Sequence, residues 1–208
     1  MVILMAKTQY YTATSIDGYI ADENNSLEWL FDVDGGAENP FGGFFAGVGA
    51  FAMGANTYEW VVANDNVVEE PQNWHDLYGQ VPCWVFTNRD LPPVPHANIF
   101  MVSGDVQRVH EAMMVAAKGK NVWLVGGGDM VGQFVDRGLL DEIILGIAPV
   151  LLGRGAPLLP RHLSSQEMIL TGTAQVGRFA YLTYAVGTPP LPDRHPATAG
   201  RIQEPAGR

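Results

Sequence analysis

The chain has 208 residues, of which 47% are hydrophobic and 16% charged, and its formal net charge is −10. This length supports one well-buried domain, and the negative charge argues against binding to a nucleic-acid backbone. The lone Cys83 excludes an intrachain disulfide and a cysteine-rich zinc site, so no metal is expected. No apolar run reaches the roughly 18 residues of a membrane span, and we therefore expect a cytoplasmic protein.

Strands and helices are predicted to alternate through the first half of the chain. In order, these are a strand at 7–15, a short strand or helical turn at 26–31, a glycine-diluted helix at 41–49, a strand at 50–54, a helix from 55, and strands at 81–87 and 98–104. An irregular polar insert precedes residue 81. Asp17-Gly18 marks a turn after the first strand.

The second half begins with the clearest helix, which Asp105 can cap and which Gly119 ends. The later elements are a strand at 121–125, a helix at 128–138, and strands at 141–152, 167–177 and 179–187. This order predicts an α/β fold whose mostly parallel sheet has an antiparallel C-terminal edge. Residues 1–186 are expected to form the domain, and the Pro-, Gly- and Ala-rich residues 187–208 a flexible tail.

At three places a strand is followed directly by small or polar residues, in the stretches "MGANTYE", "FTNRD" and "VGGGDMV". In an open α/β sheet, ligands bind beyond the carboxyl ends of the strands, where helix N-termini present free N–H groups. A pyrophosphate could lie on the glycine turn, and Arg89 could bind a ribose 2′-phosphate. The alternatives are a structural glycine turn, an ordinary helix-start threonine and an exposed arginine without a ligand.

The glycine turn does not fit the Rossmann fingerprint. Val131 stands where that fingerprint requires Gly or Ala, and no strand-terminal acid follows about 20 residues later.

The stretches "YYTATSIDGYIA", "FAMGANTYE", "VFTNRD" and "VWLVGGGDMVGQFVDRGLLDEIILGIAPVLLGRGAPLL" together resemble the dihydrofolate reductase-like superfamily. The closer resemblance is to its branch related to the C-terminal reductase domain of the bifunctional riboflavin-biosynthesis deaminase/reductase, and it covers Thr8 to Val186. It implies a mixed sheet of about eight strands flanked by helices, bound NADPH, hydride transfer to a C=N or C=O bond, and a homodimer.

The same resemblance implies a set of cofactor contacts and a cis peptide bond between Gly126 and Gly127. The implied cofactor-binding residues are Ala13, Ile20, Gly54, Ala55, Asn56, Thr57, Thr87, Asn88, Arg89, Gly126, Gly127, Gly128, Asp129, Met130 and Val131.

Departures from the family pattern narrow the possible activities. Ala55 stands where relatives often have Arg, which leaves Arg89 as the determinant of NADPH over NADH. Gly146 occupies the place of the threonine that helps bind folate, so dihydrofolate reductase activity is disfavoured. The zinc deaminase motifs H-x-E and P-C-x-x-C are not found in the chain.

Fewer sequence features point to residues that bind the substrate than to residues that bind the cofactor. Asp17 is a candidate proton donor or substrate anchor, with a turn aspartate as the alternative, and Glu38 is a weaker candidate acid. Four aromatic residues could line a pocket for a flat heterocycle or belong to the core: Trp29, Phe41, Phe44 and Tyr58.

Three functions are compatible with these sequence features and with the resemblance. The leading hypothesis is an NADPH-dependent reductase of a small, heterocyclic or carbonyl substrate. The second is a 5-amino-6-(5-phosphoribosylamino)uracil-type reductase, whose substrate phosphate would need cations near Asp17, although residues 17–44 contain no Lys or Arg. The third is a nucleotide-binding module without turnover.

Overall fold

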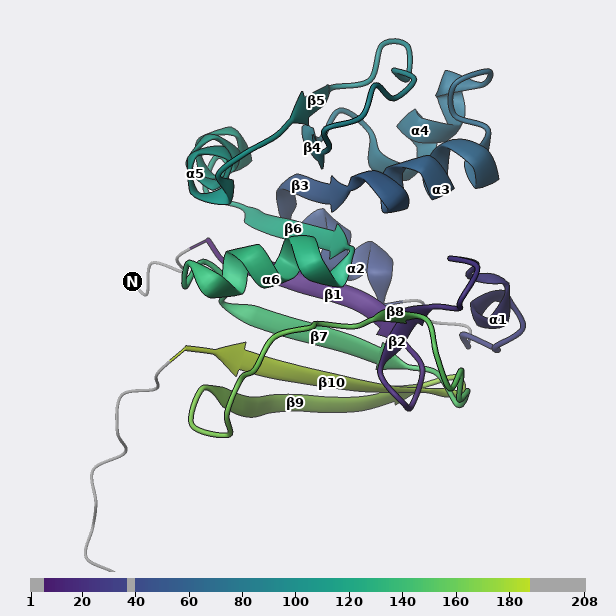
Figure 1. Ribbon diagram of the computed structural model, residues 1–208, viewed down its shortest axis with the longest axis vertical. Coiled ribbons are helices and arrows are strands. Elements are labelled where there is room, and N and C mark those ends of the chain that lie inside the picture. The colour runs from purple at the N-terminus through teal and green to yellow at the C-terminus, as the bar shows by residue number, and fades with distance from the viewer. Residues whose placement is uncertain (1–5, 37–39, 188–208) are drawn as a thin grey trace, which may run out of the picture.

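The computed structural model describes residues 6–36 and 40–187 (Figure 1). Its strands are β1 Thr8–Thr14, β2 Tyr19–Ala21, β3 Val48–Gly54, β4 Cys83–Phe86, β5 Ile99–Val102, β6 Asn121–Gly126, β7 Glu142–Ile147, β8 Ala156–Pro157, β9 Met168–Val176 and β10 Phe179–Val186. Its helices are α1 Glu28–Phe31, α2 Phe41–Ala46, α3 Ala55–Asp65, α4 Pro71–Tyr78, α5 Val106–Ala117 and α6 Gly128–Asp136. Within the described ranges, no helix is long and apolar enough to cross a membrane.

Eight strands form one sheet in the order β5-β4-β3-β6-β1-β7-β10-β9. The first six run parallel, and β10 and β9 add an antiparallel edge. The predicted fold class is confirmed. Because β3, β6, β1 and β7 are parallel neighbours, their carboxyl ends meet along one edge of the sheet, which is where an α/β protein places its ligands.

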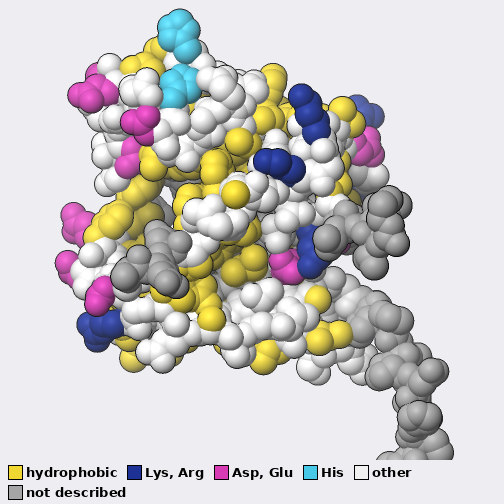
Figure 2. All heavy atoms as spheres, turned by 180° about the vertical axis from the view of Figure 1, so that it is seen from behind, with side chains coloured by type: hydrophobic (Ala, Val, Ile, Leu, Met, Phe, Trp, Pro, Cys, Tyr) yellow, Lys and Arg dark blue, Asp and Glu magenta, His cyan; other side chains and the backbone are white. Residues whose placement is uncertain are grey.

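Helices cover both faces of the sheet, and Figure 1 shows α6 in front of it and α2 behind. Side chains alternate between the faces along each strand. Tyr10 and Leu124 therefore face α5 and α6, whereas Tyr11 and Trp123 face α2, α3 and α4. Figure 2 shows hydrophobic side chains gathered across the middle of the rear face.

The predicted helix ends have the expected geometry. The Asp105 carboxylate accepts a hydrogen bond from the Gln107 N–H at 3.1 Å and so caps α5. Gly138, at φ +65°, follows α6, and the Leu139 N–H donates to the Phe134 carbonyl at 2.9 Å.

Several parts of the chain differ from the prediction. The helix predicted at 41–49 ends at Ala46, and β3 already begins at Val48. The insert before residue 81 contains α4, which begins at Pro71 and buries Trp74 and Tyr78 four residues apart on one face. The strand predicted at 141–152 ends at Ile147. Pro149 follows two residues later and has no N–H to donate to a neighbouring strand.

Candidate active site

The three predicted segments follow the carboxyl ends of β3, β4 and β6, and helices begin after β3 and β6. The segment after β4 leads through an irregular stretch to β5, so the expectation of a helix there is wrong. A Cβ built on Gly126 would lie 3.4 Å from Thr57 Oγ1, and one built on Gly54 would lie 3.7 Å from the Gly126 carbonyl oxygen. Parallel pairing of β3 with both β4 and β6 produces this convergence.

Arg89 supplies positive charge to this corner from the segment after β4. Its Nη2 donates to Asn56 Oδ1 at 2.6 Å, and its Nη1 lies 2.9 Å from Glu59 Oε2. The Arg89 N–H donates to Thr87 Oγ1 at 2.8 Å, which fixes the backbone of the segment. The guanidinium therefore lies at the first turns of α3, within reach of an anionic ligand that competes with Glu59.

The glycine turn between β6 and α6 has an open side and a packed side. A Cβ on Gly127 would meet no atom within 4 Å, whereas a Cβ on Gly128 would lie 2.6 Å from the Leu158 carbonyl oxygen. At the start of α6, the Val131 N–H donates to the carbonyl of the N-cap residue Gly127 at 3.1 Å. The N–H groups of the preceding helical residues have no partner within the helix and can face an anion.

The described chain has no cis peptide bond, so the expectation of a cis Gly126-Gly127 bond is wrong. Gly127 joins the strand to the helix with φ −37° and ψ 146°. At Gly128 the bare backbone is required by the close approach of residues 157–158, whereas Gly127 faces open space.

Arg161 neutralises the acidic side chain in the first turn of α6. It lies 3.2 Å from Asp129 Oδ1 and 2.9 Å from Asp136 Oδ2. These two carboxylates raise the pKa of Arg161, with the Asp136 hydrogen bond as the main cause. Asp129 would otherwise repel a phosphate at the helix N-terminus.

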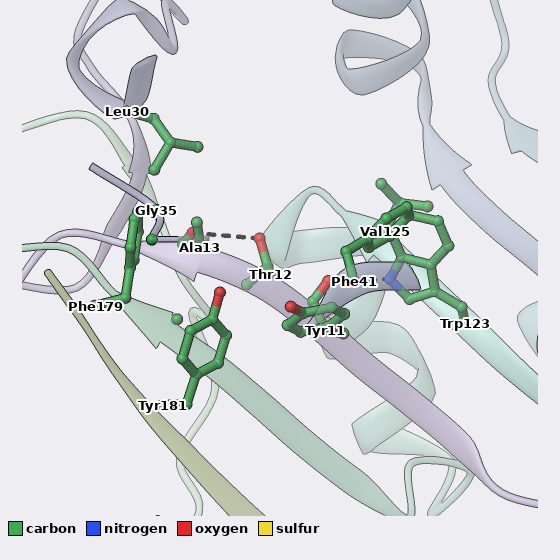
Figure 3. Close-up of a pocket in the computed structure, with 12 residues that line it drawn as sticks. Tyr11, Thr12, Ala13, Leu30, Gly35, Phe41, Trp123, Val125, Phe179 and Tyr181 are labelled. Carbon is green, nitrogen blue, oxygen red and sulfur yellow. Dashed lines mark hydrogen bonds between the residues drawn. The ribbon is translucent and has the colours of Figure 1, made fainter. Parts of the chain in front are cut away.

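A cavity of about 400 Å³ lies next to the glycine turn, between the carboxyl halves of the central strands and α1–α2 (Figure 3). Its lining residues are Tyr11, Thr12, Ala13, Leu30, Gly35, Gly36, Phe41, Trp123, Val125, Gly146, Phe179 and Tyr181. Val125 lines the cavity and directly precedes Gly126, the first glycine of the turn, so the cavity and the glycine turn both lie at the carboxyl end of β6.

Tyr11 and Tyr181 enter the cavity from β1 and β10, and their hydroxyl ends face each other in Figure 3. Burial raises the pKa of Tyr11, and the neighbouring Tyr181 raises it further. Tyr181 lies opposite Gly146 in the β7–β10 register. Among the described lining residues, Tyr11, Tyr181 and Thr12 carry hydroxyl groups, and the Thr12 hydroxyl donates to the Ala13 carbonyl at 3.3 Å.

The four aromatic residues predicted for the pocket lie in different surroundings. Phe41 lines the cavity, and Phe44 packs behind it with its ring centroid 4.5 Å from that of Tyr11. Trp29 lies in α1, but its neighbour Leu30 lines the cavity instead. The assignment of Tyr58 to the substrate pocket is wrong, because its ring is fully buried in the core and its hydroxyl donates to the Pro92 carbonyl at 2.7 Å.

Some of the remaining predicted residues lie at the cavity or at the strand ends, and others lie away from both. Ala13 lines the cavity, whereas Ile20 lies in the short strand β2 and does not. Ala55 opens α3, and Asn88 is exposed after β4. Glu38 lies outside the described residues.

Asp17 does not reach the cavity. Its carboxylate accepts hydrogen bonds from Ser15 Oγ at 2.6 Å, the Gly153 N–H at 2.6 Å and the Leu152 N–H at 3.1 Å. These bonds, led by that from Ser15, lower the pKa of Asp17. The geometry thus favours a structural role, in which Asp17 ties the β1–β2 turn to the loop after β7.

Sequence reasoning missed most of the cavity wall. Tyr11, Trp123 and Tyr181 belong to three strands that are distant in sequence but share one face of the sheet. Alternation along each strand could have assigned the residues to faces. The strand order that brings them together could not be deduced from the pattern alone.

With this geometry established, comparison with known proteins defines the family: residues 6–179 match the RibD C-terminal domain, and the chain belongs to that family. It is 32% identical to the uncharacterized protein YwjB of Bacillus subtilis, over 86% of this chain and 97% of that protein.

Solved structures agree with the assignment of the fold. The chain is similar to a putative riboflavin biosynthesis protein from Shewanella sp. PV-4, with 28% identity, a TM-score of 0.70 and coverage of 86% of this chain and 98% of that one. A dihydrofolate reductase from Enterococcus faecalis, complexed with NADP(H), shares the fold at 14% identity and a TM-score of 0.56, covering 86% and 96% of the two chains.

Proposed function

We propose that the protein is a cytoplasmic, NADPH-dependent reductase that transfers a hydride to a C=N or C=O bond of a small heterocyclic compound. The observation that carries this proposal is that the open glycine turn and the aromatic cavity lie next to each other at the carboxyl end of β6. Membership in a family named for a reductase domain supports the same class of reaction.

The glycine turn, Arg89 and the cavity wall each suit one part of the cofactor. The unfilled space beside Gly127 and the first N–H groups of α6 suit a pyrophosphate, which a side chain at residue 127 would obstruct. Arg89 suits a ribose 2′-phosphate, because its guanidinium is at the same corner and can exchange Glu59 for a phosphate. Ala13, at the cavity wall, suits the nicotinamide end.

When bound, the nicotinamide supplies the hydride. The chain orients the two reactants and excludes water from them. Phe41, Trp123 and Phe179 provide apolar ring surfaces around the cavity, and the Tyr11 and Tyr181 hydroxyls provide its polar contacts. A largely apolar wall with few polar groups is typical of a small-molecule site.

A second candidate is the reductase of a phosphoribosylamino-pyrimidine. The family and the resemblance to a putative riboflavin biosynthesis protein favour it. Among the described residues that line the cavity, none is Lys or Arg. A substrate phosphate would therefore lack a cation at the wall, and we rank this activity second.

We also propose a homodimer. β9 is an edge strand with apolar side chains exposed at Ile169 and Leu170, which is a surface that a second copy could cover. The mass of the purified protein, measured by light scattering, should be twice that of the chain. A monomeric mass at micromolar concentration would contradict this proposal.

The proposed reaction is tested with NADPH that carries deuterium at the transferred position of nicotinamide C4. The protein is incubated with a panel of pyrimidines and pteridines, and the products are analysed by mass spectrometry. Transfer of the deuterium to a heterocycle, with matching NADP⁺ formation, is the expected result. Binding of NADPH without deuterium transfer to any compound would favour the non-catalytic nucleotide-binding module.

A further inference from the structure

The geometry points to Tyr181, positioned by Tyr11, as the hydrogen-bond donor that anchors and orients an uncharged, planar heterocycle in the cavity. This inference rests on the proposed function and specifies its substrate class. It assigns the recognition of the reducible C=N or C=O group to a side chain on the antiparallel strand β10.

Bare backbone on β7 allows Tyr181 to occupy this position. Tyr181 pairs with Gly146, and Gly146 in turn pairs with Ala13 on β1. A Cβ on Gly146 would lie 3.2 Å from Tyr181 Cε1 and 3.4 Å from its hydroxyl oxygen. The phenol ring therefore lies against the glycine, and a side chain at residue 146 would require the ring to shift.

Tyr11 packs beside Tyr181, with their ring centroids 6.4 Å apart. The Tyr11 ring is itself held by Phe44, at a centroid distance of 4.5 Å, and by Phe41 at 6.2 Å. Burial, followed by the neighbouring Tyr181, raises the pKa of Tyr11, so Tyr11 stays protonated and uncharged at neutral pH. The Tyr181 hydroxyl points into the same cavity and can donate its proton to a ligand.

The composition of the wall selects against charged ligands. Among the described residues that line the cavity, none is Asp, Glu, Lys, Arg or His. Burying a phosphate or carboxylate there would remove its hydration without supplying a counter-charge. Aromatic rings at Phe41, Trp123 and Phe179 instead offer faces and edges to a flat ring.

The size of the cavity limits the ligand as well. Its volume of about 400 Å³ is near the lower end of the range of about 300–1,000 Å³ for small-molecule sites. The nicotinamide would share this space, which leaves room for a heterocycle of one or two rings. A donor at Tyr181 would polarise the C=N or C=O bond of such a ring toward hydride acceptance.

Lumazine, a neutral bicyclic heterocycle, serves as the binding probe in the absence of NADPH. Its binding is followed by quenching of tryptophan fluorescence, since Trp123 lines the cavity. Tyr181→Phe should weaken binding about tenfold through loss of one hydrogen bond. The matched control is Tyr184→Phe, because Tyr184 is on the same strand and pairs with Ile143, which faces the opposite core.

A double-mutant cycle separates positioning from general damage to the fold. Gly146→Ala should weaken lumazine binding as much as Tyr181→Phe does, and the double variant should be no weaker than either single variant. Melting temperature and NADPH affinity should stay unchanged in Tyr181→Phe. Additive losses, or equal lumazine affinity in Tyr181→Phe and the wild type, would overturn the assignment.

Charge selectivity is tested with uridine and uridine 5′-monophosphate in the same assay. Uridine should bind at least tenfold more tightly. Tighter binding of the monophosphate, or no saturable lumazine binding by the wild type, would overturn the inference. Because these probes are measured without NADPH, their outcome is separate from that of NADPH binding, which tests the proposed function.

Discussion

Two adjacent glycines allow the cofactor assignment to be separated from the stability of the fold. Gly127→Ala places a methyl group where no atom lies within 4 Å, at a φ of −37°, which is negative and free of left-handed strain. Gly128→Ala places it 2.6 Å from the Leu158 carbonyl oxygen and 2.9 Å from its carbonyl carbon. The first variant should fold normally and the second should be destabilised.

The magnitude for Gly128→Ala follows from how firmly the opposing backbone is held. The Leu158 N–H donates to the Gly18 carbonyl at 2.9 Å, and the Tyr10 hydroxyl donates to the Leu158 carbonyl at 2.9 Å. Relief of the clash must strain these bonds, for which overpacking costs of about 1–3 kcal/mol apply. At about 2–4 °C per kcal/mol for a chain of this size, the melting temperature should fall by about 2–12 °C.

The expected effect of Gly127→Ala is on binding. The loss of glycine flexibility in the unfolded chain contributes about 0.4–1 kcal/mol of stability, so the melting temperature should not fall. The added methyl group occupies the approach of the pyrophosphate, and we expect the NADPH affinity to fall at least tenfold. Thermal unfolding and NADPH fluorescence titration on both variants provide the two readouts. Unchanged NADPH affinity in Gly127→Ala would refute the placement of the pyrophosphate, and an unchanged melting temperature in Gly128→Ala would refute the packing argument.

Three further variants test individual residues. Arg89→Ala should lower NADPH affinity about tenfold through loss of a charge-assisted bond, with little effect on NADH affinity. The control is Arg137→Ala, because Arg137 is equally exposed and its loss should change the affinity for neither cofactor. Equal effects of Arg89→Ala on both affinities would contradict the role of Arg89. Asp17→Asn should lower the melting temperature at pH 7 but not abolish turnover. Because the pKa of Asp17 is lowered in the folded state, the stability that its carboxylate contributes is present above the unfolded pKa and is lost as the pH falls through the folded pKa. The difference in melting temperature between Asp17→Asn and wild type should therefore shrink toward pH 3. A difference that stays constant with pH would contradict this. Tyr58→Phe should cost about 1 kcal/mol in chemical unfolding, through loss of the buried bond to Pro92, and should leave lumazine affinity unchanged.

The fold was largely predictable because local patterns and the superfamily resemblance agreed. Buried runs such as 121–126 lead directly into amphipathic helices, and Asp105 and Gly138 mark helix ends by local chemistry. The helix α4 was missed because its polar residues suggested an insert, although Pro71 and the spacing of Trp74 and Tyr78 favoured a helix.

The two halves of the candidate site differed in how well the sequence predicted them. The proposed phosphate site involves short segments at strand ends that the sequence pattern singled out, and parallel pairing of β3 with β4 and with β6 brings these segments together. The cavity depends on residues from four strands and on the register that places Tyr181 opposite Gly146. Aromatic residues alone did not distinguish the core residue Tyr58 from the wall residue Phe41.

The central claim is that the glycine turn and Arg89 bind NADPH with its nicotinamide in the aromatic cavity. The most direct measurement is titration with NADPH and NADH, following energy transfer from tryptophan to the reduced nicotinamide, because Trp123 lines that cavity. The account predicts saturable, micromolar binding of NADPH with strong energy transfer, and much weaker binding of NADH. Absence of saturable binding of either cofactor would contradict it.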